Sequence, residues 1–73
     1  MTTERMKLEL VREGPYIVEV EVTLYESDHE WAPFLTAADV RKLDDVRLAL
    51  RRGDLKAAAK LGRLFELTPV AAE

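Results

Sequence analysis

The chain has no cysteine and little glycine, proline or histidine: its 73 residues include three glycines, three prolines and one histidine. Without cysteine it can form neither disulfides nor thiolate metal sites, which often stabilise small domains. The glycines are scattered at positions 14, 53 and 62, so there is no glycine-rich phosphate loop. A domain of this length buries only about 60% of its unfolded surface. We therefore expect a second chain to add stability.

Long apolar runs are absent as well. No stretch approaches the ~20 residues that span a bilayer, and residues 1–5 lack the apolar core of a signal peptide. We expect a soluble, cytoplasmic protein with no membrane contact. It should form one small domain over residues 1–73, with 1–5 and 70–73 as flexible ends.

Candidates for catalysis are sparse. His29 lies between Asp28 and Glu30, and a histidine beside carboxylates can bind a divalent metal or act as a general base. A zinc site, however, needs three or four converging ligands, and a general base needs a nucleophile to activate. The sequence supplies neither set. We therefore predict no enzymatic activity, no cofactor, and no catalytic, cofactor-binding or metal-ligating residues.

Strand patterns dominate the first third of the chain. Apolar and polar residues alternate over 6–10 and, more cleanly, over 16–25. This period of two indicates half-buried strands. Residues 12–15 lie between them and contain the glycine and proline typical of a turn. The pattern predicts an antiparallel β-hairpin.

The apolar rows of the two predicted strands have even numbers: Met6, Leu8 and Leu10 on one, Val18, Val20, Val22 and Leu24 on the other. Directly opposed residues share a face, so their numbers should sum to an even value. This predicts a turn with an odd number of residues, or a bulge. A turn at 13–15 puts Leu10 opposite Val18 but also Glu9 opposite Glu19, so the register stays open.

Helix signals begin after a predicted loop at 26–35. Thr36 can cap a helix, with Asp39 three residues later as an imperfect capping box. The helix should run over about 37–52 and end at Gly53.

Asp54 can cap a second, shorter helix over about 55–62. Residues 64–68 then predict a short final strand before Pro69. The resulting fold class is α+β, in the order β-β-α-α-β.

The first predicted helix has one apolar stripe. Val40, Leu43, Val46 and Leu50 fall on one side at 100° per residue and should pack on the hairpin. Leu48 falls on the opposite side. It is either an isolated exposed leucine or a candidate partner contact.

Charge is unevenly distributed around a net value of −3. Residues 1–40 carry a net −6 and residues 41–73 a net +3, a split that can orient a charged partner. The candidate anion or nucleic-acid contacts are Arg51, Arg52, Lys56, Lys60 and Arg63. The last three are spaced to line one helix face, which could touch phosphates or be simply solvated.

Two aromatic residues stand three positions apart at Trp31 and Phe34. They either close one end of the core or form an exposed anchor, because tryptophan is enriched at binding hot spots. Both are therefore candidate partner contacts.

The chain from 31 to 70 is similar to a group of small, uncharacterised bacterial proteins with no known activity. The segments behind this resemblance are Trp31-Ala32-Pro33, Lys42-Leu43-Asp44-Asp45-Val46-Arg47, Arg52-Gly53-Asp54-Leu55 and Phe65-Glu66-Leu67-Thr68-Pro69-Val70. The resemblance covers just over half of the chain and implies no mechanism.

These observations favour a non-enzymatic protein-interaction module, self-associating as a homodimer or bound to another protein. The open edges of a small sheet are natural docking sites. The alternatives are a nucleic-acid-binding regulator that uses the basic helix face, or an antitoxin-like partner of a small bacterial protein.

Overall fold

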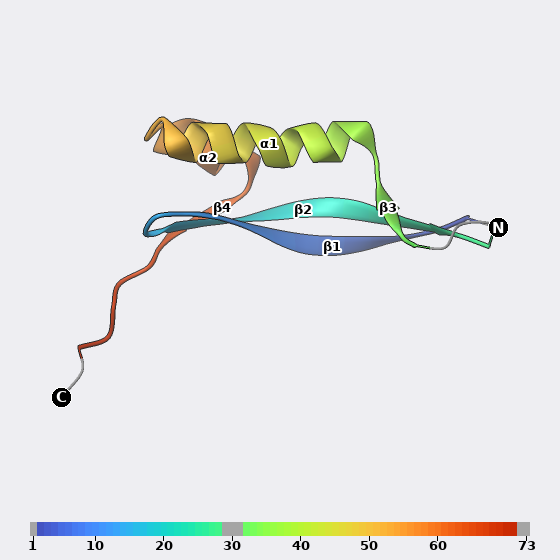
Figure 1. The fold of residues 1–73 in the computed structure, drawn as a ribbon, viewed down its shortest axis with the longest axis horizontal. Helices are drawn as coiled ribbons and strands as arrows, with labels where there is room; N and C mark the ends of the chain where they lie inside the picture. The colour runs from blue at the N-terminus through green and yellow to red at the C-terminus, as the bar shows by residue number, and fades with distance from the viewer. Residues whose placement is uncertain (1, 29–31, 72–73) are drawn as a thin grey trace.

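The computed structural model describes residues 2–28 and 32–71. Its elements are β1 (Thr2–Glu13), β2 (Tyr16–Ser27), β3 (Phe34–Leu35), α1 (Ala37–Arg51), α2 (Leu55–Leu61) and β4 (Arg63–Glu66). The strands form one sheet, and both helices lie on the same side of it (Figure 1). This confirms the α+β class and the predicted order of elements.

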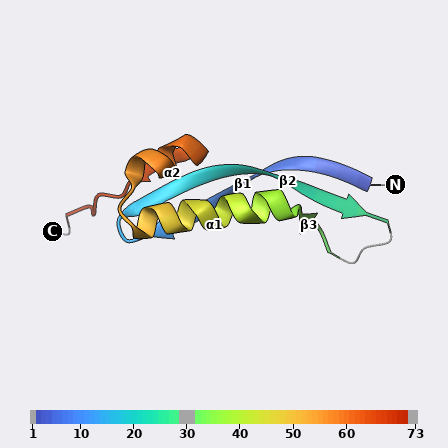
Figure 2. The same ribbon diagram turned by 90° about the horizontal axis from the view of Figure 1, so that it is seen from above.

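The central strand of the sheet is β2. It pairs with β1 along its whole length at one edge. At its other edge, β4 pairs with residues 16–19 and β3 with residues 24–25, all antiparallel. The view from above shows α1 running along this hairpin and α2 beside it near the turn (Figure 2). Within the described chain, β2 therefore has neighbours at both edges, whereas β1 has one.

The hairpin turn is two residues long, so the prediction of an odd-numbered turn or a bulge is wrong. Glu13 lies opposite Tyr16, which leaves Gly14 and Pro15 as the turn. Gly14 has a φ of +58°, and two-residue hairpins favour a positive φ at this first position. The fixed negative φ of proline suits the second position. Local turn chemistry, rather than the shared alternation, sets the register.

This register turns the apolar row of β1 away from the helices. Val11, not Leu10, lies opposite Val18, and Leu10 lies opposite Glu19. Glu9 therefore faces Val20 and avoids the expected Glu9–Glu19 pair. The even-numbered residues of β1 and those of β2 point to opposite faces of the sheet.

The hydrophobic core lies between β2 and the helices. Its buried residues are Val11, Val18, Val20, Val22, Val46, Ala49, Leu50 and Ala58. All are small or medium aliphatic side chains, so the core is thin and stability should be modest for a domain of this size. Leu43 packs against this core, but Val40 is 46% exposed and leaves the predicted apolar stripe.

Both helix starts follow the sequence prediction. Thr36 Oγ1 accepts a hydrogen bond from the Asp39 N–H at 3.2 Å, and Asp54 Oδ1 accepts one from the Ala57 N–H at 3.1 Å. Gly53, with a φ of +72°, follows the end of α1. The helices thus lie within a residue of the predicted bounds.

The strands differ more from prediction than the helices. β1 already begins at Thr2, so residues 2–5, expected as a flexible end, pair with β2. β3 lies in the predicted loop, and β4 covers 63–66 rather than 64–68. These are short or terminal segments, whose own sequence carries little periodicity and whose pairing comes from tertiary contact.

Candidate interaction surface

The sheet face opposite the helices carries an exposed apolar row on β1. Met6, Leu8 and Leu10 point to this face and are 62%, 57% and 60% exposed. No helix or strand of the described chain lies over it (Figure 1). Three neighbouring aliphatic side chains in water are unfavourable by roughly 25 cal/mol per Å² of apolar surface. We define this row as the β1 apolar row.

Aromatic residues extend the apolar surface along the same face. The ring centroids of Tyr25 and Phe34 lie 5.7 Å apart in a stacked pair. At the other end of β2, Phe65 lies opposite Ile17, and the Arg63 guanidinium sits 5.3 Å from the Phe65 ring centroid. Such a cation–π contact holds both side chains in place.

Acidic residues border the β1 apolar row on its β2 side. Glu19 lies opposite Leu10, and Glu21 lies opposite Leu8. On this face, the aliphatic side chains of β1 therefore lie at the edge of the sheet, and the Glu19 and Glu21 carboxylates of β2 lie at its centre. A partner that covers the aliphatic row without covering the carboxylates must approach from the β1 edge.

The outer edge of β1 pairs with no strand of the described chain. It presents twelve residues of backbone with the β1 apolar row along one side. A long, unpaired edge with apolar side chains is a template for another strand. Edge and row together form the candidate interaction surface.

The edge of β2 that faces away from β1 is covered in part by side chains of α1. Its unpaired stretch at 20–23 is capped by two side chains from α1. The Thr23 N–H donates to Asp39 Oδ2 at 2.9 Å, and the Lys42 ammonium donates to the Glu21 carbonyl at 3.2 Å. This edge is therefore blocked against strand addition, while the β1 edge is open.

A pocket of about 380 Å³ lies beside this capped stretch. Its charged lining residues are Glu19, Glu21, Lys42, Lys60 and Arg63. Two carboxylates and three cations thus line the pocket, so charges of both signs meet there.

The predicted partner contacts do not come together. Phe34 lies on the open sheet face beside Tyr25 and is 45% exposed. Leu48 is 49% exposed on α1, which lies on the other side of the sheet. Trp31 lies outside the described residues.

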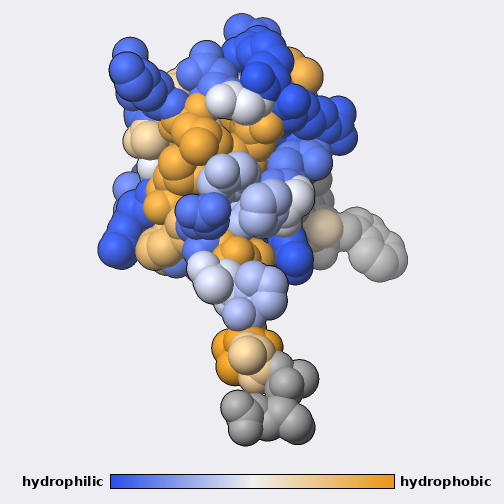
Figure 3. All heavy atoms as spheres, turned by 90° about the vertical axis from the view of Figure 1, so that its left-hand side faces the viewer, coloured by the Kyte–Doolittle hydropathy of each residue, from blue (hydrophilic) through white to orange (hydrophobic). Residues whose placement is uncertain are grey.

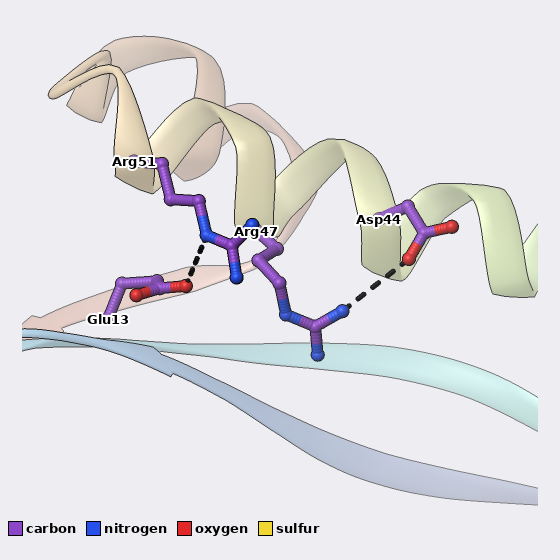
Figure 4. Close-up of polar contacts among 4 residues, drawn as sticks. All are labelled: Glu13, Asp44, Arg47 and Arg51. Carbon is purple, nitrogen blue, oxygen red and sulfur yellow. Dashed lines mark hydrogen bonds and ion pairs between the residues drawn. The ribbon is translucent and has the colours of Figure 1, made fainter.

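The five basic residues predicted as anion or nucleic-acid contacts do not lie on one element. Arg51 donates from Nε to Glu13 Oε1 at 2.7 Å, and Figure 4 shows this pair beside the Arg47–Asp44 pair on α1. Arg52 is the C-cap residue of the same helix.

The remaining three cations lie on two elements. Lys56 and Lys60 are exposed on α2, while Arg63 belongs to β4 because α2 ends at Leu61. The predicted spacing of these three along one helix face therefore does not hold. In the described part of the chain, Arg52, Lys56 and Lys60 form no ion pair.

The end of the molecule that carries the hairpin turn has a mixed surface. Figure 3 shows an apolar area at its centre, bordered by hydrophilic side chains, with the C-terminal segment extending away.

Potential metal ligands do not cluster among the described residues. Across residues 2–28 and 32–71, no three histidine or carboxylate side chains gather as a metal site requires. The candidate His29 lies outside the described residues.

The β1 apolar row lies on the opposite face from the one that the sequence pattern predicts. Because both apolar rows have even numbers, the pattern predicts that Met6, Leu8 and Leu10 share a face with the even-numbered valines of β2. The signal that could have located them is the Gly14-Pro15 pair, because a two-residue turn makes opposed residues sum to an odd number.

No protein-family model, curated protein or solved structure was found to match the chain. The resemblance to small bacterial proteins therefore stays a prediction. No helix within the described residues is long and apolar enough to cross a membrane.

Proposed function

We propose that the chain is a non-enzymatic protein-interaction module that self-associates. The observation that carries this proposal is the β1 apolar row, which is more than half exposed along a strand edge that pairs with no strand of the described residues. Exposed apolar patches bordered by polar residues commonly mark protein contacts. The small core supports the same proposal, since burial of this row adds apolar area that the fold alone does not provide.

Light scattering over a range of protein concentrations tests this function. The expected result is a mass that rises from monomer toward dimer as concentration increases. The double variant M6D/L10D should stay monomeric, because charges on the row must be desolvated for association. K56E, which changes the net charge by the same two units on exposed α2, is the matched control and should associate like the parent. A monomeric mass at every concentration would contradict self-association.

Nucleic-acid binding is a second candidate, favoured by the exposed Arg52, Lys56 and Lys60, which form no ion pair with another described residue. Fluorescence anisotropy with labelled DNA and RNA at low salt tests it. Binding should weaken steeply as salt rises, and the variant K56E/K60E should reduce the salt dependence by about two released ions. Absence of binding to both nucleic acids at low salt would remove this candidate.

A further inference from the structure

We infer that the partner of the β1 edge is a second copy of this chain, paired antiparallel to β1 about a two-fold axis at Leu8. This inference rests on the proposed function and specifies its interface. The two sheets would join into one, with both helix layers on the same side. Four observations on the edge backbone and its side chains support it.

The first observation concerns the direction of the backbone groups. At the far edge of β2, the Thr23 N–H donates to Asp39 Oδ2, and the Glu21 carbonyl accepts from Lys42. The odd-numbered residues of β2 thus point their backbone N–H and C=O groups to that edge, and the even-numbered residues point theirs to β1. Because opposed residues have opposite parity, the even-numbered residues of β1 point their N–H and C=O groups outward. These are the residues of the β1 apolar row.

The second observation is the match of the apolar side chains. With the axis at Leu8, the two Leu8 residues lie directly opposite each other as a hydrogen-bonded pair. Met6 then lies opposite the partner's Leu10 on both sides of the axis. Six aliphatic side chains form one continuous cluster, and each cross-strand pair adds stability.

The third observation is the match of charges on both faces. On the helix side, Lys7 lies opposite the partner's Glu9, and both side chains are accessible there, 52% and 34% exposed. On the apolar side, Glu4 lies opposite the partner's Arg12. Each of these pairs occurs twice by symmetry. Lys7 and Glu9 already pair within β1 at 3.0 Å, so the dimer would join two such pairs into a ring of four charges.

The fourth observation is that the neighbouring registers lose this match. Moving the axis to Lys7 puts the two Lys7 ammonium groups opposite each other. Moving it to Glu9 does the same with two carboxylates, and like charges directly opposed are destabilising. Face-to-face stacking of two sheets would cover Glu19 and Glu21 without partners, at a desolvation cost. Among these arrangements, only the axis at Leu8 avoids both conflicts.

Single-cysteine variants can read out this register, because the parent chain has no cysteine. In the inferred dimer the two residues at position 8 have Cα atoms about 5.5 Å apart, within disulfide range. Two residues at position 6, or two at position 10, lie about 13 Å apart along the strands, beyond that range. The variants are L8C, M6C and L10C, each oxidised at equal concentration and analysed on a non-reducing gel.

The expected result is rapid cross-linking of L8C alone, slow cross-linking of M6C or L10C alone, and rapid cross-linking of a mixture of M6C and L10C. Rapid cross-linking of M6C or L10C alone would assign another register and overturn the inference. Dimers by light scattering without any selective cross-link would overturn the β1 pairing while leaving self-association intact. A monomer in both experiments would overturn the inference and the proposed function together.

Charge exchange provides an independent test by analytical ultracentrifugation. K7E and E9K each place two like-charged pairs across the interface and should weaken the dimer about tenfold. The double variant K7E/E9K restores opposite charges and should recover the parent affinity. K56E, with the same charge change on α2, is the control and should associate normally. If K7E and K56E have equal dimer affinity, the inferred register is wrong.

Discussion

β1 and β2 have the same length and nearly the same alternation of apolar and polar residues, yet their apolar rows meet opposite environments. Val18 and Val20 on β2 are fully buried, whereas Leu8 on β1 is 57% exposed. The difference lies in their neighbours. β2 is paired at both edges and covered by α1, while the apolar row of β1 faces away from the helices. Alternation therefore identifies the two faces of a strand, and the covering layer decides which face forms the core.

The largest expected difference between the strands follows from one charge placed on each. V20D buries an unpaired carboxylate, which costs about 3–5 kcal/mol and should unfold a domain of modest stability. L8D places the same group in water and should change the free energy of unfolding by about 0.5 kcal/mol or less. Circular dichroism with urea titration, at a concentration where the chain is monomeric, measures both. Equal losses would mean that β1 is as buried as β2.

A second difference concerns how closely other elements approach β2. Gly62 lies against the strand, and an added Cβ would meet the Glu19 carbonyl oxygen and come within 2.8 Å of Val18 Cγ1. G62A should therefore cost about 1–3 kcal/mol, because the start of β4 must move away.

The control for this variant is K60A, two residues earlier on the exposed face of α2, which should stay within about 0.5 kcal/mol of the parent. Urea unfolding compares the two. If G62A is as stable as K60A, β4 approaches β2 less closely than the structure indicates.

The helix caps could be predicted from the sequence, whereas the hairpin register was predicted wrongly. Thr36 and Asp54 cap their helices as predicted, because a cap depends on residues only three positions apart. The predicted hairpin register is wrong because two local signals conflict. The even-numbered apolar rows favour a turn with an odd number of residues, whereas Gly14-Pro15 favours a two-residue turn, and the structure has the two-residue turn.

The candidate surface could be predicted only in part for a related reason. Leu48 is exposed as the helix pattern predicts, and Phe34, for which the sequence leaves a core position and an exposed anchor open, is exposed as well. Which apolar residues share a face, however, depends on the register. The face that the β1 apolar row occupies follows from that register, so neither the composition of β1 nor the spacing of its residues could predict it. The capping of the β2 edge by Asp39 and Lys42 joins residues 16 to 21 positions apart, so local patterns could not reveal it.

A smaller effect should come from the capped edge of β2. Asp39 accepts the Thr23 N–H in a part-buried hydrogen bond of 2.9 Å. D39A leaves this amide without its partner and should cost about 1–2 kcal/mol, since hydrogen bonds to charged groups are stronger than neutral ones. D45A, which removes an exposed carboxylate from the same helix, is the matched control. Amide exchange at Thr23 should speed up in D39A alone, and unchanged exchange would contradict the capping role.

The smallest effect belongs to the β1 side, at the ion pair between Glu13 and Arg51. The Arg51 side chain is 60% exposed and that of Glu13 29%, so water and salt screen much of their attraction. A double-mutant cycle with E13A, R51A and both should give a coupling of about 0.2–1 kcal/mol that shrinks in high salt. A coupling above that of the Asp39 contact would show that β1 is fixed to the helices as firmly as β2. A coupling in the expected range would mean that this ion pair adds little to the attachment of β1, which then rests on its pairing with β2 and on the buried Val11.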